Sequence, residues 1–522
     1  MERLLKDVGP WHIPVFLLAL TGSLPYGLFV ISLSFMAPKM NYWCKPPAGV
    51  NHSQWLEMND GVYPRCEVRS LVTRSSGDNM STLATEKCLE WEYDHTFHTR
   101  TLIEEWNAVC DRHWMLATAQ SCLMFGVLVG CFVFSHISDW YGRKRCYVLS
   151  LALIIMTGFA ISFTHDYWAF CALRFLMAVG HGGKRVANAI TAECVGANHR
   201  AIVTVGQDIG WCLGLILTPL ITYYIRDWVW IQRTIMLPEF AFIVLAYYLD
   251  ESPKWLLSAG REEEARQVLT RIIQKNGLSL RKDLDVDVII RETTEALQKE
   301  KRTQRGTLLD LLRGWKVFKL SVSCWGQYGV IILLYYHMMY FIVDIGSNPY
   351  MGVLYMALLE VPITAAAWWV VNNFRRRPVY IWSYLLSIFS VVALLLPSED
   401  AVGIRMVLAN LGKMASMFQY NCLLVHISEV FPTKVRSVAL GTSAMSSRIG
   451  AMAAPFLKEV GLATAVWVPI CVTLGMCTIA MLLSFLLPET FGQKLPDTFH
   501  ETKQMLRKSP STTEKPAVTL IP

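Results

Sequence analysis

The stretch ECVGANHR, from Glu193 to Arg200, has a counterpart in EVFPTKVR, from Glu429 to Arg436. Each stretch follows a long apolar segment, and both place a glutamate and an arginine at the same spacing. Two further charged positions recur at nearly the same offset along the chain: Arg143 with Arg377, and Glu251 with Glu489. Charges that recur between apolar segments are typical of a membrane chain made of two related halves.

The composition indicates that lipid surrounds most of the side chains. The chain has 522 residues, of which 53% are hydrophobic and 17% are charged, and its mean hydropathy is +0.35. A soluble helical protein of this size is the alternative, but it would need long polar helix faces. Segments such as 149–163 and 476–487 have no such face, so we expect a membrane protein.

A helix needs about 20 predominantly apolar residues to cross about 30 Å of hydrocarbon. The sequence predicts such helices at residues 12–37, 114–135, 146–165, 167–192, 201–224, 230–249, 317–343, 348–372, 379–396, 401–426, 437–459 and 463–487. The predicted fold class is therefore an all-α membrane protein with about twelve transmembrane helices, six in each of two pseudo-symmetric halves.

Lysine and arginine residues gather on one side of this predicted topology, at the turns 143–145 and 375–377 and in the segment 250–316. Cytosolic loops retain positive charge near membrane spans, so we place this side, with both termini, in the cytosol. The expected domains are 1–249 as the N-terminal half, 250–316 as a cytosolic helical linker, 317–487 as the C-terminal half and 488–522 as a cytosolic tail. The net charge of +7 lies in membrane-flanking turns, where anionic lipids account for it, and predicts no nucleic-acid partner.

The long segment 38–113 falls on the opposite side. It contains two Asn-x-Ser acceptors, Asn51 and Asn79, and four cysteines, Cys44, Cys66, Cys88 and Cys110. We expect an extracellular loop that is glycosylated and disulfide-bonded. Four cysteines allow three pairings, and the sequence does not choose among them.

The linker contains a predicted amphipathic helix over 261–275, which ends at Asn276-Gly277. Its apolar face consists of Ala265, Val268, Leu269, Ile272 and Ile273. A second charged helix is expected at about 285–301. The tail after Phe499 is rich in Ser, Thr and Pro and is expected to be disordered.

Short motifs connect the chain to a known family. Residues Ser138 to Lys144 (SDWYGRK) resemble the loop between helices 2 and 3 of major facilitator transporters. Further motifs resemble the organic cation, anion and zwitterion transporters of that superfamily: EWNAVCD from Glu105, RF at Arg174, ESPKWL from Glu251, EVFPTKVR from Glu429, and LPET and LPDT from Leu487 and Leu495. The resemblance covers nearly the whole chain. It implies the major facilitator fold and a plasma-membrane carrier of small organic ions that works by alternating access.

Charged residues at the predicted cytosolic helix ends are candidate gating residues: Asp139, Arg143, Glu193 and Arg200 in the first half, and Arg376, Glu429 and Arg436 in the second. We expect ion pairs among them to stabilise the outward-facing state. One exposed ion pair contributes less than about 1 kcal/mol, so several would act together. The alternative is that these charges only keep the loops on the cytosolic side.

An ionisable side chain at bilayer depth is costly unless it faces a cavity or a partner. Such residues and nearby aromatic and amide side chains form the predicted substrate site: Arg448, Tyr335, Tyr336, Tyr420, Lys413, Glu360, Gln207, Trp211, Lys184 and Arg185. Asp208, also inside a span, is expected to pair with Lys184 or Arg185. Through the resemblance, Tyr420 corresponds to a substrate-facing aromatic residue.

Arg448 is the main predictor of charge preference. It falls where cation-selective members of the family carry Asp, and where anion and carnitine-type members carry Arg. An arginine can hold a carboxylate or sulfonate with two hydrogen bonds, so an anion or a carnitine-like zwitterion is favoured. An organic cation remains the alternative, because Glu360 can bind a cationic group or simply pair with Lys413, and the tyrosines can hold ammonium through their ring faces.

No sequence motif predicts an enzyme. The chain has no Gly-x-x-x-x-Gly-Lys-Ser/Thr, His-Glu-x-x-His, Cys-x-x-Cys or Gly-x-Ser-x-Gly pattern, and we expect no cofactor and no metal. The expected partners are a small organic ion, a co-transported ion or counter-substrate, and the lipid bilayer. A non-transporting membrane sensor or receptor with a transporter fold is the remaining alternative.

Overall fold

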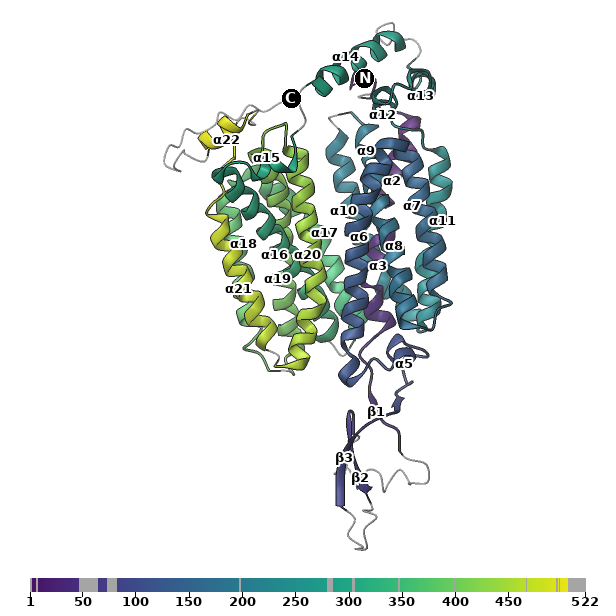
Figure 1. Cartoon of the computed structure of the whole chain (residues 1–522), viewed down its shortest axis with the longest axis vertical. Helices are drawn as coiled ribbons and strands as arrows, with labels where there is room; N and C mark the ends of the chain where they lie inside the picture. The colour runs from purple at the N-terminus through teal and green to yellow at the C-terminus, as the bar shows by residue number, and fades with distance from the viewer. Residues whose placement is uncertain are drawn as a thin grey trace.

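The computed structural model describes residues 2–5, 8–46, 64–72, 82–196, 199–278, 285–302, 306–345, 348–398, 400–465, 467–493, 496 and 498–505. Two bundles of long helices lie side by side (Figure 1). One end carries α12 (Pro253–Ser258), α13 (Glu262–Lys275), α14 (Val286–Arg302) and α15 (Leu308–Leu312), and we call it the linker end. The opposite end carries the strands β1 (Tyr42–Cys44), β2 (Glu67–Val72), β3 (Thr82–Lys87) and β4 (Trp91–Tyr93), and we call it the loop end.

The first bundle contains the helices up to residue 248. Its long helices are α2 (Ile13–Thr21) with α3 (Leu24–Met36), α6 (Trp114–Tyr141), α7 (Arg143–Ile161), α8 (Tyr167–Ala187), α10 (Arg200–Tyr224) and α11 (Trp228–Tyr248). Short helices flank them: α1 (Glu2–Leu5), η1 (Pro10–His12), α5 (Leu102–Trp106), η2 (Cys110–Arg112) and α9 (Ala189–Glu193).

The second bundle follows the linker. It contains α16 (Trp315–Ile345), α17 (Pro349–Asn373), α18 (Arg376–Ala393), α19 (Val402–Val430), α20 (Arg436–Ala463) and α21 (Trp467–Ser484), and a short helix, α22 (Phe499–Met505), comes after it. The tail after Phe499 was predicted to be disordered, and for residues 499–505 that prediction is wrong. The hydroxyl of Thr502 donates to the carbonyl of Val430 at 3.1 Å, which docks α22 on the end of α19.

Eight helical segments of the described chain are apolar enough, by length and composition, to cross a membrane: Pro10–Met36, Cys110–Tyr141, Arg143–Ile161, Val205–Tyr224, Trp228–Tyr248, Trp315–Ile345, Pro349–Asn373 and Trp467–Ser484. The other four predicted spans coincide with the long helices α8, α18, α19 and α20. These helices carry charged side chains that the bundles bury, such as Arg174, Arg376 and Lys413. Their average hydropathy falls for that reason, although their outer faces expose large apolar residues such as Phe389 and Ile449.

Close helix packing in the first bundle depends on small residues. At Gly130 of α6, a Cβ atom would collide with the backbone carbonyl of Val179 in α8, and at Gly182 of α8 it would collide with Val127 of α6. Small residues allow helix backbones to approach closely in membranes, where apolar burial alone gives no driving force. Helices α6 and α8 are therefore closely packed against each other in the first bundle.

The two bundles meet mainly through α6 against α20 and through α10 against α17. At the loop end, the Tyr350 ring of α17 lies 5.3 Å from the Phe35 ring, 5.6 Å from Tyr223 and 5.9 Å from Phe97. In the described residues, the ring contacts and side-chain hydrogen bonds that join the bundles lie at the loop end or near mid-height. The bundles are therefore held together at the loop end rather than at the linker end.

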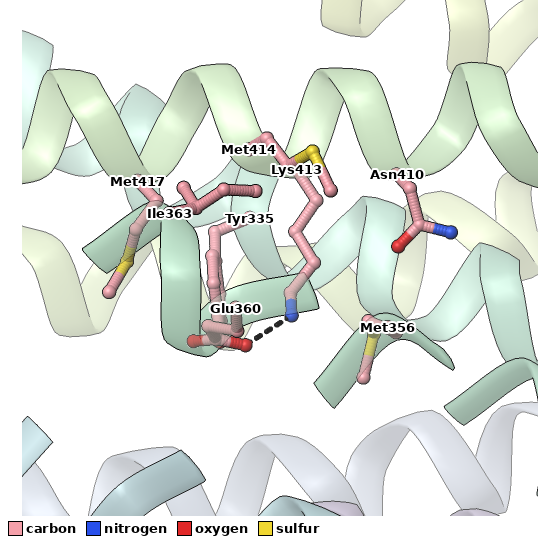
Figure 2. Close-up of a pocket in the computed structure, with 8 residues that line it drawn as sticks. All are labelled: Tyr335, Met356, Glu360, Ile363, Asn410, Lys413, Met414 and Met417. Carbon is pink, nitrogen blue, oxygen red and sulfur yellow. Dashed lines mark hydrogen bonds and ion pairs between the residues drawn. The ribbon is translucent and has the colours of Figure 1, made fainter. Parts of the chain in front are cut away.

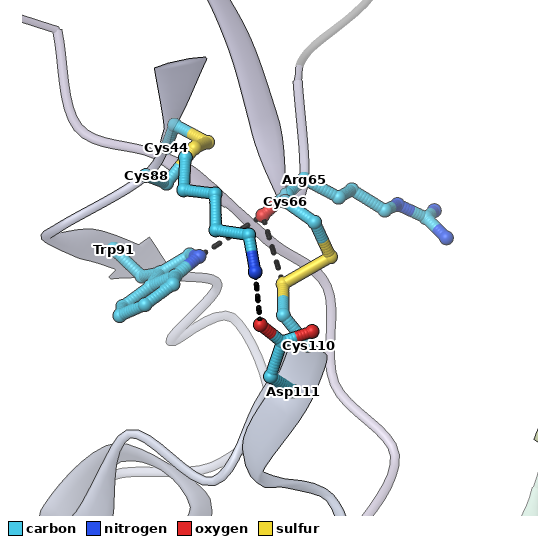
Figure 3. The surroundings of a disulfide bond; sticks show 8 residues. Cys44, Arg65, Cys66, Cys88, Trp91, Cys110 and Asp111 are labelled. Carbon is cyan, nitrogen blue, oxygen red and sulfur yellow. Dashed lines mark hydrogen bonds and ion pairs between the residues drawn. A yellow bond between two sulfur atoms is a disulfide. The ribbon is translucent and has the colours of Figure 1, made fainter. Parts of the chain in front are cut away.

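The segment between α3 and α6 is not helical throughout. β1 pairs antiparallel with β4, and β2 pairs antiparallel with β3. Disulfides join Cys44 to Cys88 and Cys66 to Cys110, which resolves the connectivity that the sequence left open (Figure 3). The predicted glycosylation sites Asn51 and Asn79 lie outside the described residues.

The linker follows its predicted pattern. α13 buries Ala265, Val268, Leu269 and Ile272, and it ends at Lys275 with Asn276 as its C-cap. Gly277 then takes a positive φ of 68°, a conformation that favours glycine. The N-terminal segment docks on this helix, because the backbone amide of Trp11 donates to Asn276 Oδ1 at 3.1 Å. The second predicted helix is α14. Helices α12 to α14 pack on the first bundle, whereas α15 packs on the second bundle, where the Ser321 hydroxyl donates to the Leu311 carbonyl at 3.2 Å.

Candidate functional site

A polar cluster lies inside the second bundle at mid-height. Glu360 of α17 and Lys413 of α19 form an ion pair with 2.5 Å between Oε2 and Nζ, and each side chain is only 4% exposed (Figure 2). The Tyr335 hydroxyl donates to Glu360 Oε1 at 2.8 Å, and Lys413 Nζ lies 4.8 Å from the centre of the Tyr335 ring. A small pocket adjoins the cluster, lined by Tyr335, Met356, Glu360, Ile363, Asn410, Lys413, Met414 and Met417.

Trp211 connects this cluster to the first bundle. Its indole Nε1 lies 3.1 Å from Glu360 Oε1 and 3.4 Å from the Tyr335 hydroxyl. Trp211 is near the middle of α10, and its ring lies 5.6 Å from the ring of Tyr26 in α3. The Glu360 carboxylate therefore accepts hydrogen bonds from both bundles, as well as pairing with Lys413.

Arg185 lies beside Tyr26, on the side of the first bundle that faces the second. Its guanidinium carbon is 4.8 Å from the centre of the Tyr26 ring, a cation–π contact. Arg185 is exposed and forms no ion pair with any other described residue. The Tyr26 hydroxyl is buried and has no hydrogen-bond partner within the described ranges.

Arg448 approaches the same place from α20 of the second bundle. Tyr26, Tyr336, Cys131 and Tyr420 lie within electrostatic range of its guanidinium. Tyr26 and Cys131 belong to the first bundle, so Arg448 lies between the two bundles. It forms no ion pair within the part of the chain that the structure describes, and no carboxylate is among those neighbours.

The tyrosines connect these groups. Tyr335 and Tyr336 are consecutive on α16, with ring centres 5.4 Å apart, and the Tyr420 ring of α19 lies 5.4 Å from the Tyr328 ring. Both Arg185 and Arg448 lie within electrostatic range of the Tyr328 and Tyr336 hydroxyls. The structure thus brings Tyr336, Tyr420, Arg185 and Arg448 together, and it groups Tyr335, Glu360, Lys413 and Trp211 beside them.

Lys184 lies apart from this group. Its Nζ is 2.7 Å from Glu239 Oε2 of α11 and 4.0 Å from the Phe242 ring centre, inside the first bundle. The expected partner Asp208 is therefore wrong for Lys184. Consecutive helical residues point about 100° apart, so Lys184 and Arg185 face different surroundings. Gln207 and Asp208 are half-buried on α10, and Asp208 lies near enough to Glu360 to interact with its charge.

The predicted gating residues of the first half form one cluster at the linker end. Arg143 Nη1 lies 2.8 Å from Asp139 Oδ1, and Arg143 Nη2 lies 3.3 Å from Glu193 Oε1. Gly142, with a φ of 105°, ends α6, and Glu251 then accepts a hydrogen bond from the backbone amide of Arg143 at 2.9 Å. A carboxylate at a helix N-terminus satisfies free amides and complements the helix dipole.

The second half repeats this arrangement. Arg376 Nη2 lies 2.8 Å from Glu429 Oε1, and Glu489 accepts from the backbone amide of Arg376 at 3.0 Å. The structural counterpart of Arg143 is therefore Arg376 rather than Arg377, which the sequence offset had matched. Thr490 adds a hydrogen bond to Glu429 at 2.6 Å.

These clusters join helices of the same bundle. The Nε and Nη2 atoms of Arg436 are buried without hydrogen-bond partners in the described ranges. Arg200 begins α10, and its side chain lies outside the described part of the structure. The described gating contacts therefore fix the linker end of each bundle separately.

Sequence reasoning missed several residues of the interface between the bundles. Gln120 of α6 donates to the Tyr340 hydroxyl of α16 at 2.8 Å, and Ser121 donates to the Met452 carbonyl of α20 at 2.8 Å. The fully buried Arg174 donates a hydrogen bond from Nη2 to Gln120 Oε1 at 3.3 Å. Tyr26, too, was not selected, although it is a polar residue within an otherwise apolar span. Polar side chains within the predicted spans were the available signal.

Comparison with known proteins identifies similar sequences over most of the chain. Residues 78–500 match the family model described as Sugar (and other) transporter. The chain is 28% identical over 442 residues to an organic cation transporter protein of Drosophila melanogaster, covering 84% of this chain and 79% of that protein. It is 26% identical over 537 residues to human organic cation/carnitine transporter 2, covering 98% of this chain and 95% of that protein. It is 29% identical over 446 residues to human solute carrier family 22 member 12, covering 84% and 79%.

Solved structures show the same architecture. The major facilitator superfamily proton:xylose symporter XylE, bound to 6-bromo-6-deoxy-D-glucose, matches with a TM-score of 0.61 and 18% identity, covering 95% of this chain and 99% of that chain. A partially occluded inward-open form of the E. coli xylose transporter XylE gives a TM-score of 0.61 at 18% identity, covering 93% and 100%. The predicted major facilitator fold and the predicted resemblance to organic ion transporters are confirmed.

Proposed function

This chain belongs to the sugar (and other) transporter family, and we propose that it carries small organic anions, or zwitterions of the carnitine type, by alternating access. Two of the relatives are named as an organic cation transporter protein and as organic cation/carnitine transporter 2, and others are named as members of solute carrier family 22. The proposed carrier moves its substrate between two halves, residues 1–249 and 317–487, without covalent chemistry.

The preference for a negative group rests on one observation. Arg448 lies between the bundles without a carboxylate partner among the described residues, next to the tyrosines Tyr26 and Tyr336. An unneutralised guanidinium in a partly dry site attracts an anion and repels a cation. The other candidate cation of the second bundle, Lys413, is already neutralised by Glu360, so Arg448 carries the proposal.

A zwitterion fits the same site through a second group of residues. Asp208, near Glu360, supplies a carboxyl group that pairs with no described lysine or arginine, and the ring of Trp211 lies between that region and Tyr26. A quaternary ammonium group can lie against such aromatic faces. A plain organic cation is the second candidate function, since these same residues favour it and two of the relatives carry cation transporter in their names.

The orientation follows from the basic linker end. We propose that the linker end and both termini are cytosolic in the plasma membrane, and that the glycosylated loop with Asn51 and Asn79 is extracellular. With this orientation, contacts such as Phe35–Tyr350 make the described conformation closed to the outside. The linker-end clusters around Arg143 and Arg376 are proposed to stabilise the opposite, outward-facing state when the two ends come together.

An uptake panel in cells tests the proposal. Radiolabelled benzoate, carnitine and tetraethylammonium serve as anionic, zwitterionic and cationic probes, for the wild type, Arg448→Gln and Arg233→Gln. Arg233 is a matched control because it lies on α11 and contacts Ser162 at 3.2 Å within the first bundle. We expect R448Q to reduce benzoate or carnitine uptake at least tenfold and R233Q to change it less than twofold. Uptake of tetraethylammonium alone would support the cation carrier, and binding without uptake would support a sensor.

A further inference from the structure

Two arginines from opposite bundles lie near the same tyrosines. Arg185 is in the last turn of α8, and its guanidinium lies 4.8 Å from the Tyr26 ring centre. Arg448, from the middle of α20, lies within electrostatic range of Tyr26 and Tyr336. Tyr336 and Tyr328 lie within electrostatic range of both arginines. The two guanidinium groups therefore flank one region between the bundles.

The neighbouring lysines, Lys184 and Lys413, each form an ion pair with a glutamate, whereas Arg185 and Arg448 form none with a described residue. Lys184 pairs with Glu239 at 2.7 Å, and Lys413 pairs with Glu360 at 2.5 Å. Within the described ranges, neither Arg185 nor Arg448 has a carboxylate within ion-pair distance. Tyr26, near both arginines, is 7% exposed, and its buried hydroxyl has no hydrogen-bond partner among the described residues. Two cations and a free hydroxyl thus surround a place that is suited to an acceptor group.

This arrangement has a consequence for closure of the linker end. The bundles touch at the loop end and at mid-height, through contacts such as Gln120–Tyr340 and Trp211–Glu360. Closing the linker end moves α8 and α20 toward each other. Two like charges repel more strongly as they approach and as closure removes the water between them, and an anion placed between them reverses the sign of that interaction.

We propose that one carboxylate or sulfonate group of the substrate is held between Arg185 and Arg448, one guanidinium from each bundle, and that this bridge permits the linker end to close. The proposal rests on the proposed carrier function and adds Arg185 as its second anion-binding residue. The empty carrier, with both arginines unneutralised, changes its exposure slowly. The loaded carrier changes it readily, so exchange of substrate across the membrane is faster than net efflux.

The test uses the purified full-length protein in liposomes, with radiolabelled benzoate and carnitine as probes. Efflux is measured with and without the unlabelled probe outside, for the wild type, Arg185→Gln, Arg185→Lys and the control Arg233→Gln. We expect the outside probe to accelerate wild-type efflux at least tenfold. R185Q should raise the KM at least tenfold and lower the acceleration to below about threefold. R185K, which keeps the charge, should recover most of the acceleration, and R233Q should match the wild type.

Labelling of Cys131 gives an independent readout of closure. Cys131 of α6 is half-buried, lies within electrostatic range of Arg448, and its thiol is 3.8 Å from the Gly182 carbonyl of α8. Maleimide labelling that is absent in Cys131→Ser should slow at least threefold when benzoate or carnitine is added to the wild type, and should not respond in R185Q. If R185Q has the KM, the acceleration of efflux by outside probe and the labelling response of the wild type, the anion bridge between Arg185 and Arg448 is overturned. The carrier function would still stand. A loss in R185Q that R185K does not relieve would also overturn the bridge. A wild-type protein that moves none of the organic ions would overturn the carrier function itself.

Discussion

The indole nitrogen of Trp211 lies 3.1 Å from a carboxylate oxygen of Glu360, so a side chain of the first bundle reaches the buried ion pair of the second. The same oxygen accepts from Tyr335 at 2.8 Å. Glu360 is thus the meeting point of a charge pair within one bundle and a hydrogen bond between bundles. A motion that separates α10 from α17 must break the Trp211–Glu360 hydrogen bond, while the Glu360–Lys413 ion pair can remain.

Replacement of Trp211 with phenylalanine tests this link. The variant keeps an aromatic ring beside Tyr26 but removes the hydrogen bond to a charged group, which contributes about 1.5–3 kcal/mol. We expect W211F to separate the bundles more readily at mid-height and to raise maleimide labelling of Cys131. Phe125→Leu, at an exposed position on α6, is the control. Labelling of W211F at the wild-type rate would contradict the link.

The Glu360–Lys413 pair gives a stability prediction. Both side chains are buried, so removing one partner leaves an uncompensated charge, at a cost of about 3–5 kcal/mol. We expect Lys413→Met and Glu360→Gln each to lower the melting temperature in detergent. The double variant should recover most of that loss, because no charge is left without a partner. A double variant that loses as much as the sum of the single variants would show that the residues act independently.

The linker-end clusters predict a shift in conformational equilibrium. Glu193 pairs with Arg143, and Glu429 pairs with Arg376. We expect Glu193→Gln and Glu429→Gln together to disfavour the outward-facing state by about 1–2 kcal/mol, which is about 5–30-fold in population. Cys131 should then be labelled faster from the linker end. Glu264→Gln, which removes an exposed pair with Arg261 in the linker, is the control, and equal labelling in both variants would favour a purely topological role.

The loop end predicts a pH dependence of stability. Burial alone would raise the pKa of Glu105, but hydrogen bonds from His165 and Arg100 more than offset this effect and lower that pKa below its ordinary value. A lowered carboxyl pKa contributes stability that is present above the unfolded-state pKa and is lost as the pH falls through the folded-state pKa. We expect Glu105→Gln to lower the melting temperature at pH 7 and to reduce its further fall on acidification. A variant with the same acid-induced fall as the wild type would contradict this role.

The repeated motifs of the sequence predicted the fold because they mark equivalent turns between consecutive helices in the two halves. Gly142 with Glu251, and Glu489 with Arg376, are such positions, since each carboxylate caps the first turn of a helix. The single-residue error between Arg376 and Arg377 arose because an offset in sequence does not specify which of adjacent arginines faces the carboxylate. The sequence predicts which residue types lie at a helix end, but it predicts less well which way each side chain faces around the helix axis.

The candidate site was predictable in its composition but not in its pairings. Lys184 and Arg185 are adjacent, yet one pairs with Glu239 inside the first bundle and the other lies on Tyr26. That difference depends on the rotation of α8 and on the packing of α11, which lie far from each other in sequence. The strands of the loop and the docking of Thr502 were missed for the same reason, since both depend on contacts made only after folding.

The most direct test of the account is counterflow by the purified wild-type protein in liposomes. Vesicles loaded with unlabelled benzoate or carnitine are diluted into a trace of the same labelled probe, with no ion gradient. A carrier that alternates its exposure accumulates label transiently above the outside concentration, and we predict this overshoot for at least one of the two probes. Label that only equilibrates would indicate a channel, and label that does not enter would contradict the account.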